Sequence, residues 1–470
     1  MTAGLSDRIE GALLATAAGD ALGAPYEFEP ARGPELPVEM VGGGPWAPGE
    51  WTDDTAMAIA IAEVAATGAD LRDAEAQDAI VARWHEWSLG AKDVGIQTRS
   101  VLHAAARGGV ITAAGARAAS AVLHEETGRT AGNGSLMRTA PVALAYLDDE
   151  DAMIEAARAI SELTHFDPDA TDAVILWCCA IRHAVLTTQL DVRVGLDHLD
   201  ADRRQLWANR LAEAEKSRPA DFPKNGWVVQ ALQAAWSAIT ATAADGHGPE
   251  HLRRGIDAAV RSGNDTDTVA AIAGGLLGAA YGGSAVPLQW RSLLHGWPGI
   301  RARGLVKLTT AIERKGPAPD PDYSSSWADI LVPHPYDLNV LLGSVSALRK
   351  MPAEVSAVVS LCRIPERDVP DDMPHVEVRL IDKVEFSENP HLDFVLLEAV
   401  RMVEELRAQG HTVLLHCVES YSRTPTVAAL YGARLRGIGT EQALADVLTT
   451  LPDANPNPVF REALRRLDRV

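Results

Sequence analysis

Two short segments in the first two thirds of the chain combine neighbouring aspartates with threonines. Residues 52–55 read Thr-Asp-Asp-Thr and residues 264–268 read Asn-Asp-Thr-Asp-Thr, and each opens an apolar stretch with helical spacing. Their carboxylate and hydroxyl oxygens are hard donors that suit Mg²⁺, Mn²⁺ or Ca²⁺. Helix capping is the alternative for either segment alone, because Thr and Asp are good N-caps. Two such segments favour a metal centre, since carboxylates gathered at one place repel each other without a cation.

A different pattern near the C-terminus places Cys417 six positions before Arg423. The cysteine follows a strand-like run, residues 412–416, and the arginine precedes a helical run, residues 427–436. A loop at a helix N-terminus directs its amides at an anion and lowers the pKa of a thiol. Arg423 can then grip phosphate oxygens while the Cys417 thiolate attacks phosphorus. The alternative is a buried structural cysteine.

Apolar segments of two kinds must position these residues. Alanine-rich runs with helical spacing predict helices at residues 7–22, 55–67, 151–163, 169–186, 227–243 and 268–281. Beyond residue 326, strands are predicted at residues 357–362, 375–381 and 412–416, with a helix at residues 392–409. Strands that alternate with helices indicate a mainly parallel sheet covered by helices.

Pro, Gly and Ser concentrate in residues 314–326, which predicts a linker. We therefore expect an all-α domain over residues 1–313 and an α/β domain with a central, mainly parallel sheet over residues 327–470.

The composition narrows the classes of function. The 470 residues are 47% hydrophobic and carry a formal net charge of -21, which argues against general binding to nucleic acids or anionic membranes. Four cysteines without a CxxC pair argue against a disulfide framework or a zinc ribbon. The most apolar stretch, residues 269–283, is too short for a membrane span. We expect a protein of the reducing cytoplasm, without a membrane partner.

Five motifs follow one another in a fixed order within the first 310 or so residues. Residues 19–27, 52–55, 132–138, 164–168 and 264–268 together resemble the ADP-ribosylglycohydrolases. The resemblance implies an all-α domain with two Mg²⁺ or Mn²⁺ ions that removes ADP-ribose from a modified acceptor. Breaking a ribosyl bond gives the ribose oxocarbenium character in the transition state. Two cations can orient the ribose hydroxyls and lower the pKa of a bound water, and a nearby carboxylate can transfer a proton.

The resemblance also implies roles for single residues. The metal ligands would be Thr52, Asp53, Asp54, Asp265, Asp267 and Thr268. Glu27 would stand beside the scissile bond and act in catalysis with Asp53, Asp54 and Asp265. Gly132, Asn133, Gly134 and Ser135 would form the loop around the diphosphate and ribose of ADP-ribose, and His165 would line the same cleft. Arg138 is open between that loop and a surface charge.

Residues from about 327 to 470 resemble the dual-specificity branch of the cysteine-dependent phosphatases. The resemblance implies Cys417 as nucleophile, Arg423 as phosphate ligand and Asp382 as general acid, with Asp393 as a weaker rival. The family usually has Ala-Gly where this chain has Glu419 and Ser420. A carboxylate there repels a dianion and the lost glycine restricts the backbone, so binding is better supported than turnover. Cys178, Cys179 and Cys362 are interpreted as core residues.

The main hypothesis is a two-domain hydrolase that removes ADP-ribose from an acceptor and recognises a phosphate ester at a second site. One alternative is a phosphatase whose first domain only binds ADP-ribose. The other is a glycohydrolase whose second domain is a non-catalytic module for a phosphorylated ligand. The acceptor and the choice between Mg²⁺ and Mn²⁺ stay open at this point.

Overall fold

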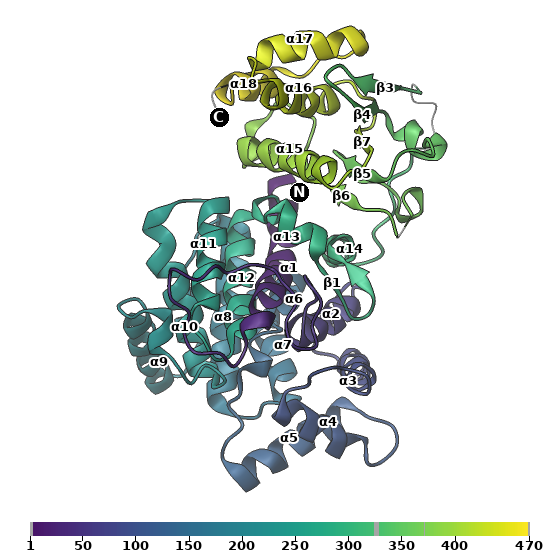
Figure 1. Cartoon of the computed structure of the whole chain (residues 1–470). Coiled ribbons are helices and arrows are strands. Elements are labelled where there is room, and N and C mark those ends of the chain that lie inside the picture. The colour runs from purple at the N-terminus through teal and green to yellow at the C-terminus, as the bar shows by residue number, and fades with distance from the viewer. Residues whose placement is uncertain (1–2, 324–328, 371, 469–470) are drawn as a thin grey trace. The chain divides into compact units, whose positions relative to one another are not determined.

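The computed structural model describes residues 3–323, 329–370 and 372–468. Its contacts divide the chain into two compact units (Figure 1). The first holds Leu5–Val286 and Leu293–Ala318, and the second holds Pro319–Val470 with short segments at residues 3–4 and 287–292. The division between Ala318 and Pro319 falls inside the predicted linker, of which residues 324–326 lie outside the described residues.

The first unit is built from helices, as the alanine-rich segments predict. Its helices are α1 (Ala3–Gly23), α2 (Asp53–Ala65), α3 (Ala74–Ser88), α4 (Ile96–Ala106), α5 (Ala113–Thr127), α6 (Ala140–Ala145), α7 (Glu150–Glu162), α8 (Pro168–Thr187), α9 (Ala201–Ala214), α10 (Val228–Thr242), α11 (Pro249–Val260), α12 (Thr266–Tyr281) and α14 (Ala302–Arg314). The short helix α13 (Leu288–Leu293) falls almost entirely in the segment that the contacts assign to the second unit. Strands β1 (His295–Gly296) and β2 (Ile300–Arg301) form a small antiparallel pair. All six helices predicted from the sequence are present.

Helices α1 and α12 touch along their backbones through glycine. A Cβ added to Gly11 would lie 2.2 Å from the Gly278 carbonyl oxygen, and one added to Gly19 would lie 2.1 Å from the Ala270 carbonyl oxygen. Gly274 likewise abuts Ala15. Because the residue numbers rise on α1 as they fall on α12, the two helices are antiparallel. The C-terminal end of α1 therefore lies beside the N-terminus of α12.

Helix α8 is, among the described residues, long and apolar enough to cross a membrane, but 78% of its apolar window is buried inside the protein. Burial of this kind is typical of a core helix.

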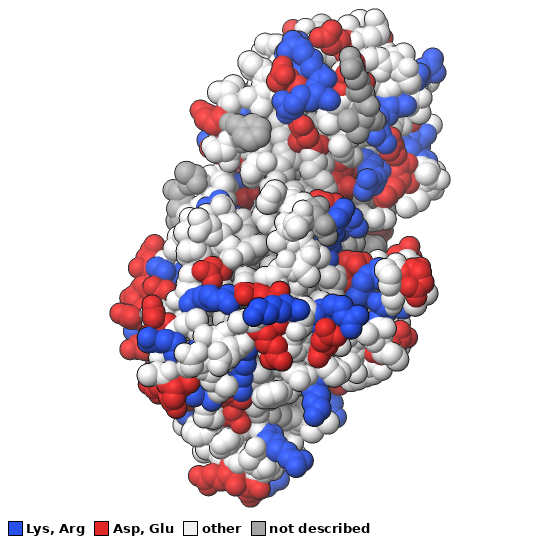
Figure 2. All heavy atoms as spheres, turned by 90° about the vertical axis from the view of Figure 1, so that its left-hand side faces the viewer, with Lys and Arg blue, Asp and Glu red and all other residues white. Residues whose placement is uncertain are grey.

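Lys and Arg side chains are interspersed with Asp and Glu side chains on the face of the molecule that Figure 2 shows.

The second unit is an α/β structure around a five-stranded sheet of order β3-β4-β7-β5-β6. Its strands are β3 (Leu331–His334), β4 (Asp337–Gly343), β5 (Ala357–Ser360), β6 (His375–Glu377) and β7 (Val413–His416), and its helices are α15 (Leu392–Ala408), α16 (Arg423–Arg436), α17 (Thr440–Thr450) and α18 (Pro458–Arg466). Only the β3–β4 pair is antiparallel within this sheet of described residues. The mainly parallel sheet is thus confirmed.

Side chains alternate between the two faces of this sheet. On β7, Val413 and Leu415 join the core formed with α15 to α18, whereas Leu414 joins a smaller core on the opposite face. The period of two follows from the strand pleat. Because β5 and β7 are parallel neighbours, their C-terminal ends and the loops after them meet at one edge of the sheet.

Candidate metal centre and phosphate loop

Six carboxylates from four segments converge in the first unit. They are Asp20 on α1, Glu27 after the 3₁₀ turn η1 (Ala24–Tyr26), Asp53 and Asp54 at the start of α2, and Asp265 and Asp267 at the start of α12. Oxygens of Asp20, Asp54 and Asp267 lie within 4.8 Å of one another. Oxygens of Glu27, Asp265 and Asp267 do so as well. The antiparallel contact of α1 with α12 brings Asp20 close to Asp267.

Asp20 lies in the acidic motif at residues 19–27, but the prediction did not include it among the metal ligands. Its carboxylate accepts hydrogen bonds from the backbone N–H groups of Thr52 and Thr55, both at 2.9 Å, and from the Thr55 hydroxyl at 2.6 Å. It therefore holds the N-terminus of α2 from a different helix. The acidic motif at residues 19–27 was the available signal, but a carboxylate inside a helix has no local pattern that marks it.

The capping alternative is not supported by the geometry. In the described structure, neither Thr52 before α2 nor Asp265 before α12 makes a side-chain cap hydrogen bond to its own helix. Instead the hydroxyls of Thr52 and Thr268 both donate to Asp54 Oδ2, at 3.1 and 3.4 Å. The threonines and aspartates thus face one another across two helix starts.

In the metal-free protein, burial and mutual repulsion raise the pKa values of these carboxyl groups. Burial, with Asp265 and other neighbouring carboxylates, raises the pKa of Glu27 to about 8. Burial raises the pKa of Asp53 to about 7, that of Asp20 to about 6, and those of Asp54 and Asp267 well above their usual range. Such a group of acids fits divalent cations, which supply the missing positive charge.

A buried oxygen of Asp54 that lacks a hydrogen-bond partner in the described structure also indicates a cation site. Asp54 is fully buried, and among the described residues its Oδ1 has no hydrogen-bond partner. A buried carboxylate oxygen left in this way is costly unless a cation or an ordered water contacts it. The residues present therefore fit a metal centre of oxygen ligands.

The loop predicted to surround ADP-ribose lies next to these acids. It forms the 3₁₀ turn η2 (Asn133–Ser135), and Asn133 Nδ2 donates to Asp265 Oδ2 at 2.8 Å. A Cβ added to Gly132 or Gly134 would lie 3.2 Å from His165 Nε2, so the imidazole packs directly against both glycines. The Ser135 hydroxyl oxygen is buried without a hydrogen-bond partner in the described structure.

His165 and Arg138 support this loop from the protein interior. His165 is 2% exposed, its Nδ1 lies 2.7 Å from the Thr164 hydroxyl, and burial lowers its pKa well below the usual range, so the ring is neutral. Arg138 is 1% exposed and donates to the same hydroxyl at 2.8 Å. The idea of Arg138 as a surface charge is therefore wrong.

In the second unit, Cys417 follows β7 and Arg423 is the first residue of α16. Arg423 Nη1 donates to the carbonyl oxygens of Leu361 and Leu380, at 2.8 and 3.2 Å, which fixes the guanidinium beside the loop. Its Nε is buried with no hydrogen-bond partner among the described residues. Such a donor is available to an oxyanion.

The two candidate acids differ in where they point. Asp382 Oδ1 accepts from the Ser422 hydroxyl in the loop at 2.8 Å and from Asn457 Nδ2 at 2.9 Å. Asp393 instead pairs with Arg466 at 2.6 Å. The structure thus brings Asp382 to the loop, and it reveals Asn457 as a partner that no sequence pattern had indicated.

The two departures from the family pattern have different consequences. Glu419 is exposed, so its carboxylate is solvated. Ser420 adopts a left-handed conformation with φ 56°, as a glycine would, and its hydroxyl donates to the Gly343 carbonyl oxygen. A loop that normally uses glycine is thus formed by serine at a conformational cost.

We expect Ser420→Ala to destabilise the second unit and Ser420→Gly to be more stable than Ser420→Ala by about 1 kcal/mol, because only alanine keeps the left-handed strain. Urea unfolding of the full chain, followed by a signal from the second unit, measures this difference. Equal stabilities of the two variants would show that this backbone strain is absent.

Known proteins are similar to each of the two units of this chain. A family model described as ADP-ribosylglycohydrolase matches residues 1–318. The ADP-ribosylarginine hydrolase Tri1 of Pseudomonas putida (strain GB-1) is 32% identical over 291 residues, 60% of this chain and 73% of that protein. The ADP-ribosyl-(dinitrogen reductase) glycohydrolase of Rhodospirillum rubrum is 30% identical over 302 residues, 61% of this chain and 90% of that protein. Dual specificity protein phosphatase 1 of Arabidopsis thaliana is 29% identical over 148 residues, 31% of this chain and 73% of that protein.

Proposed function

The chain belongs to the ADP-ribosylglycohydrolase family, and from this premise we propose that its first unit is a metal-dependent hydrolase that releases ADP-ribose from modified arginine. The observation that carries the metal dependence is the fully buried Asp54, whose Oδ1 lacks a hydrogen-bond partner in the described structure although other acids surround it. Two ions, Mg²⁺ or Mn²⁺, would orient the ribose hydroxyls and lower the pKa of a water.

The chain's own residues divide the remaining work. Thr52, Asp53 and Asp54 from α2 and Asp265, Asp267 and Thr268 from α12 are the proposed ligands. Asp20 positions them, because it bonds the N-terminus of α2. Asn133 links the proposed ADP-ribose loop to Asp265 at 2.8 Å, so the loop and the acids keep a common geometry.

The proposed acceptor follows from the names of relatives. Two proteins similar to this chain are called ADP-ribosylarginine hydrolases. We therefore expect arginine-linked ADP-ribose to be a better substrate than serine-linked ADP-ribose.

Release of free ADP-ribose from a panel of ADP-ribosylated peptides tests this function. We expect turnover of the arginine-linked peptide after adding Mg²⁺ or Mn²⁺ to the metal-free protein, and much slower turnover of the serine-linked peptide. Full turnover in excess chelator would contradict the metal mechanism. A preference for serine would contradict the acceptor alone.

We expect Glu27→Gln to lower kcat by about 10²-fold or more, the usual contribution of a positioned acid or base, while the affinity for ADP-ribose changes little. In the metal-free protein, burial and the neighbouring carboxylates raise the pKa of Glu27 to about 8, and its carboxyl oxygen lies within 4.8 Å of those of Asp265 and Asp267. Turnover assays and calorimetry with ADP-ribose separate the two quantities.

Glu29→Gln is the matched control for this variant. Glu29 lies two residues further along the same segment and faces solvent, where it pairs with Arg32 at 3.6 Å. Its replacement should leave both turnover and affinity unchanged. If Glu27→Gln instead weakens the affinity for ADP-ribose and keeps a normal kcat, Glu27 does not act on the bond that is broken.

A second activity is proposed for the second unit, because Cys417, Arg423 and Asp382 surround one loop at a helix N-terminus. The expected reaction is hydrolysis of a phosphate ester without metal, through attack by Cys417 on phosphorus. The competing proposal is a module that only binds a phosphorylated ligand, and the same loop would serve it.

A further inference from the structure

A cluster of different chemistry lies in the first unit, away from the six carboxylates. It consists of Glu150, the first residue of α7, Cys179 on α8, and His198, the last residue of the 3₁₀ helix η3 (Arg193–His198). The ligand atoms of all three lie within 4.8 Å of one another, and His198 Nε2 is 3.7 Å from Glu150 Oε1. We propose that these three side chains bind one Zn²⁺ ion.

The donor set determines which cation would bind. One sulfur, one imidazole nitrogen and one carboxylate oxygen are the ligands that Zn²⁺ takes in proteins, whereas Mg²⁺ prefers oxygen alone. Tetrahedral zinc would place such ligands roughly 3.5 Å apart, which is close to the 3.7 Å between His198 Nε2 and Glu150 Oε1. A partly exposed Glu150 and His198 leave room for a water as fourth ligand.

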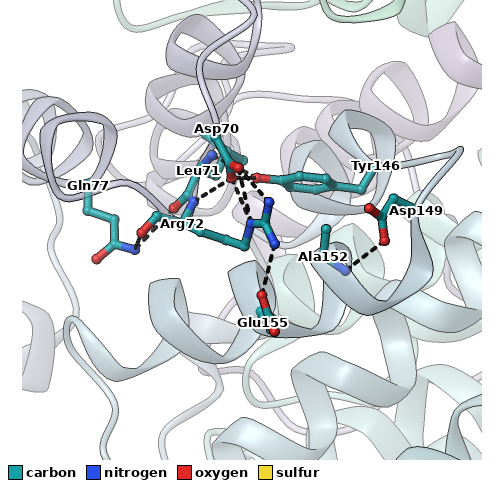
Figure 3. Close-up of polar contacts among 8 residues, drawn as sticks. All are labelled: Asp70, Leu71, Arg72, Gln77, Tyr146, Asp149, Ala152 and Glu155. Carbon is teal, nitrogen blue, oxygen red and sulfur yellow. Dashed lines mark hydrogen bonds and ion pairs between the residues drawn. The ribbon is translucent and has the colours of Figure 1, made fainter.

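The start of α7 is held in place independently of any metal (Figure 3). Asp149 caps the helix by accepting from the Ala152 N–H at 3.0 Å, which places Glu150 as its first residue. Just before it, the Tyr146 hydroxyl donates to Asp70 at 2.6 Å, and Asp70 also binds Arg72. The hydrogen bond of Asp149 therefore fixes Glu150 at the start of α7 without a metal ion.

Contact between η3 and α8 brings the other two ligands together. A Cβ on Gly195 would lie 2.9 Å from the Leu176 Cα and 3.3 Å from the Cys179 Cβ, so only glycine permits this approach. Residues i and i+3 of a 3₁₀ helix lie on the same face. His198 is three residues after Gly195 and thus lies on the face that contacts Cys179.

Charge balance is also favourable. A thiolate and a carboxylate neutralise Zn²⁺, which matters because Cys179 is 1% exposed. Glu150 uses Oε1 toward His198, while its Oε2 lies 3.5 Å from Arg182 Nη1. Arg182 would then orient the ligand carboxylate from outside the ion's coordination sphere. The ion would tie α7, α8 and η3 together.

Cobalt(II) titration of the full chain in excess Mg²⁺ tests the site, because only a thiolate ligand gives sulfur-to-cobalt charge-transfer absorption. A Cys362→Ser/Cys417→Ser background removes the thiols of the second unit. We expect the absorption in this background and its loss on adding Zn²⁺. Cys179→Ser should abolish it, and His198→Gln should weaken cobalt affinity at least tenfold.

Cys178→Ser is the matched control, because the Cys178 thiol is equally buried but points to the Thr139 carbonyl oxygen. It should keep the absorption. Absence of the band in the background protein, or an unchanged cobalt affinity in His198→Gln, would overturn the proposal. His198 is partly exposed, so its variant decides the question even if Cys179→Ser does not fold.

Discussion

Replacing Asp267 with asparagine should abolish release of ADP-ribose and at the same time make the metal-free protein more stable. Asp267 belongs to both groups of converging carboxylates, with Asp20 and Asp54 on one side and Glu27 and Asp265 on the other. Asparagine has the same shape, but it supplies no charge to a cation. We expect turnover to fall more than about 100-fold, beyond the effect of a partner outside the metal's coordination sphere.

The gain in stability has a definite pH dependence. A carboxyl group whose pKa is higher in the folded than in the unfolded state costs stability as the pH rises from its unfolded value through its folded value. For this cluster the window runs from about 4 through the values of about 6 for Asp20, 7 for Asp53 and 8 for Glu27. Because the pKa of Asp267 is also raised well above its usual range, Asp267→Asn should stabilise the metal-free protein near pH 8 by more than the roughly 1.4 kcal/mol that one pKa unit represents, and by little near pH 4.

Asp172→Asn is the control, because it should change the stability of the metal-free protein in the opposite direction. The Asp172 carboxylate accepts from Arg203 Nε at 2.6 Å and from Trp207 Nε1 at 2.9 Å, so its charge is compensated. That variant should lower stability and leave turnover unchanged. Thermal unfolding in chelator and an ADP-ribose release assay measure both quantities. A metal-free Asp267→Asn that is less stable than the parent near pH 8 would contradict the repulsion argument.

Much of this centre could be predicted from sequence because its ligands stand at helix starts, where polar residues interrupt apolar runs. Asp53, Asp54, Asp265 and Asp267 are visible in this way. Asp20 is not, because its partners Thr52 and Thr55 lie more than 30 residues away and it sits within a helix. Its role depends on the glycine contact between α1 and α12, which only the folded structure displays.

In the second unit, too, the sequence predicts some elements and not others. Strands β5, β6 and β7 and helix α15 follow from their apolar patterns, whereas β3 and β4 were not predicted. Strand β3 contains Pro333 and lies at the edge of the sheet, and β4 begins with Asp337, so neither resembles a buried strand. Asn457 could not be found either, because its hydrogen bond to Asp382 joins residues 75 positions apart.

The other large effect is expected at Asp382 in the second unit. Asp382→Asn should lower kcat for an aryl phosphate by about 10²-fold or more, because the leaving oxygen then receives no proton. The effect should be greatest for phenyl phosphate and smaller for nitrophenyl phosphate, whose leaving group needs less protonation. A merely structural role of Asp382 would lower both rates equally.

Asp393→Asn is the matched control, since Asp393 pairs with Arg466 rather than with the loop. It should leave both rates unchanged. If Asp393→Asn instead reproduces the dependence on leaving group, the two acids exchange roles and the hydrogen bond from Ser422 to Asp382 is only structural.

Cys417→Ser then decides between turnover and binding in the same unit. A hydroxyl is a far weaker nucleophile than a thiolate, so hydrolysis should stop, whereas Arg423 and the loop amides keep their places and phosphate affinity should persist. All three thiols are buried, but only Cys417 lies in the loop before α16, so it should alkylate faster than Cys178 and Cys179, and tungstate should protect it. Protection without hydrolysis of any ester in the parent chain would mean that Ser420 and Glu419 leave a loop that recognises a phosphorylated ligand. If tungstate gives no protection and Cys417 does not alkylate faster than the other cysteines, the oxyanion site itself is rejected, because a nucleophilic cysteine in an anion-binding loop must show at least one of these properties.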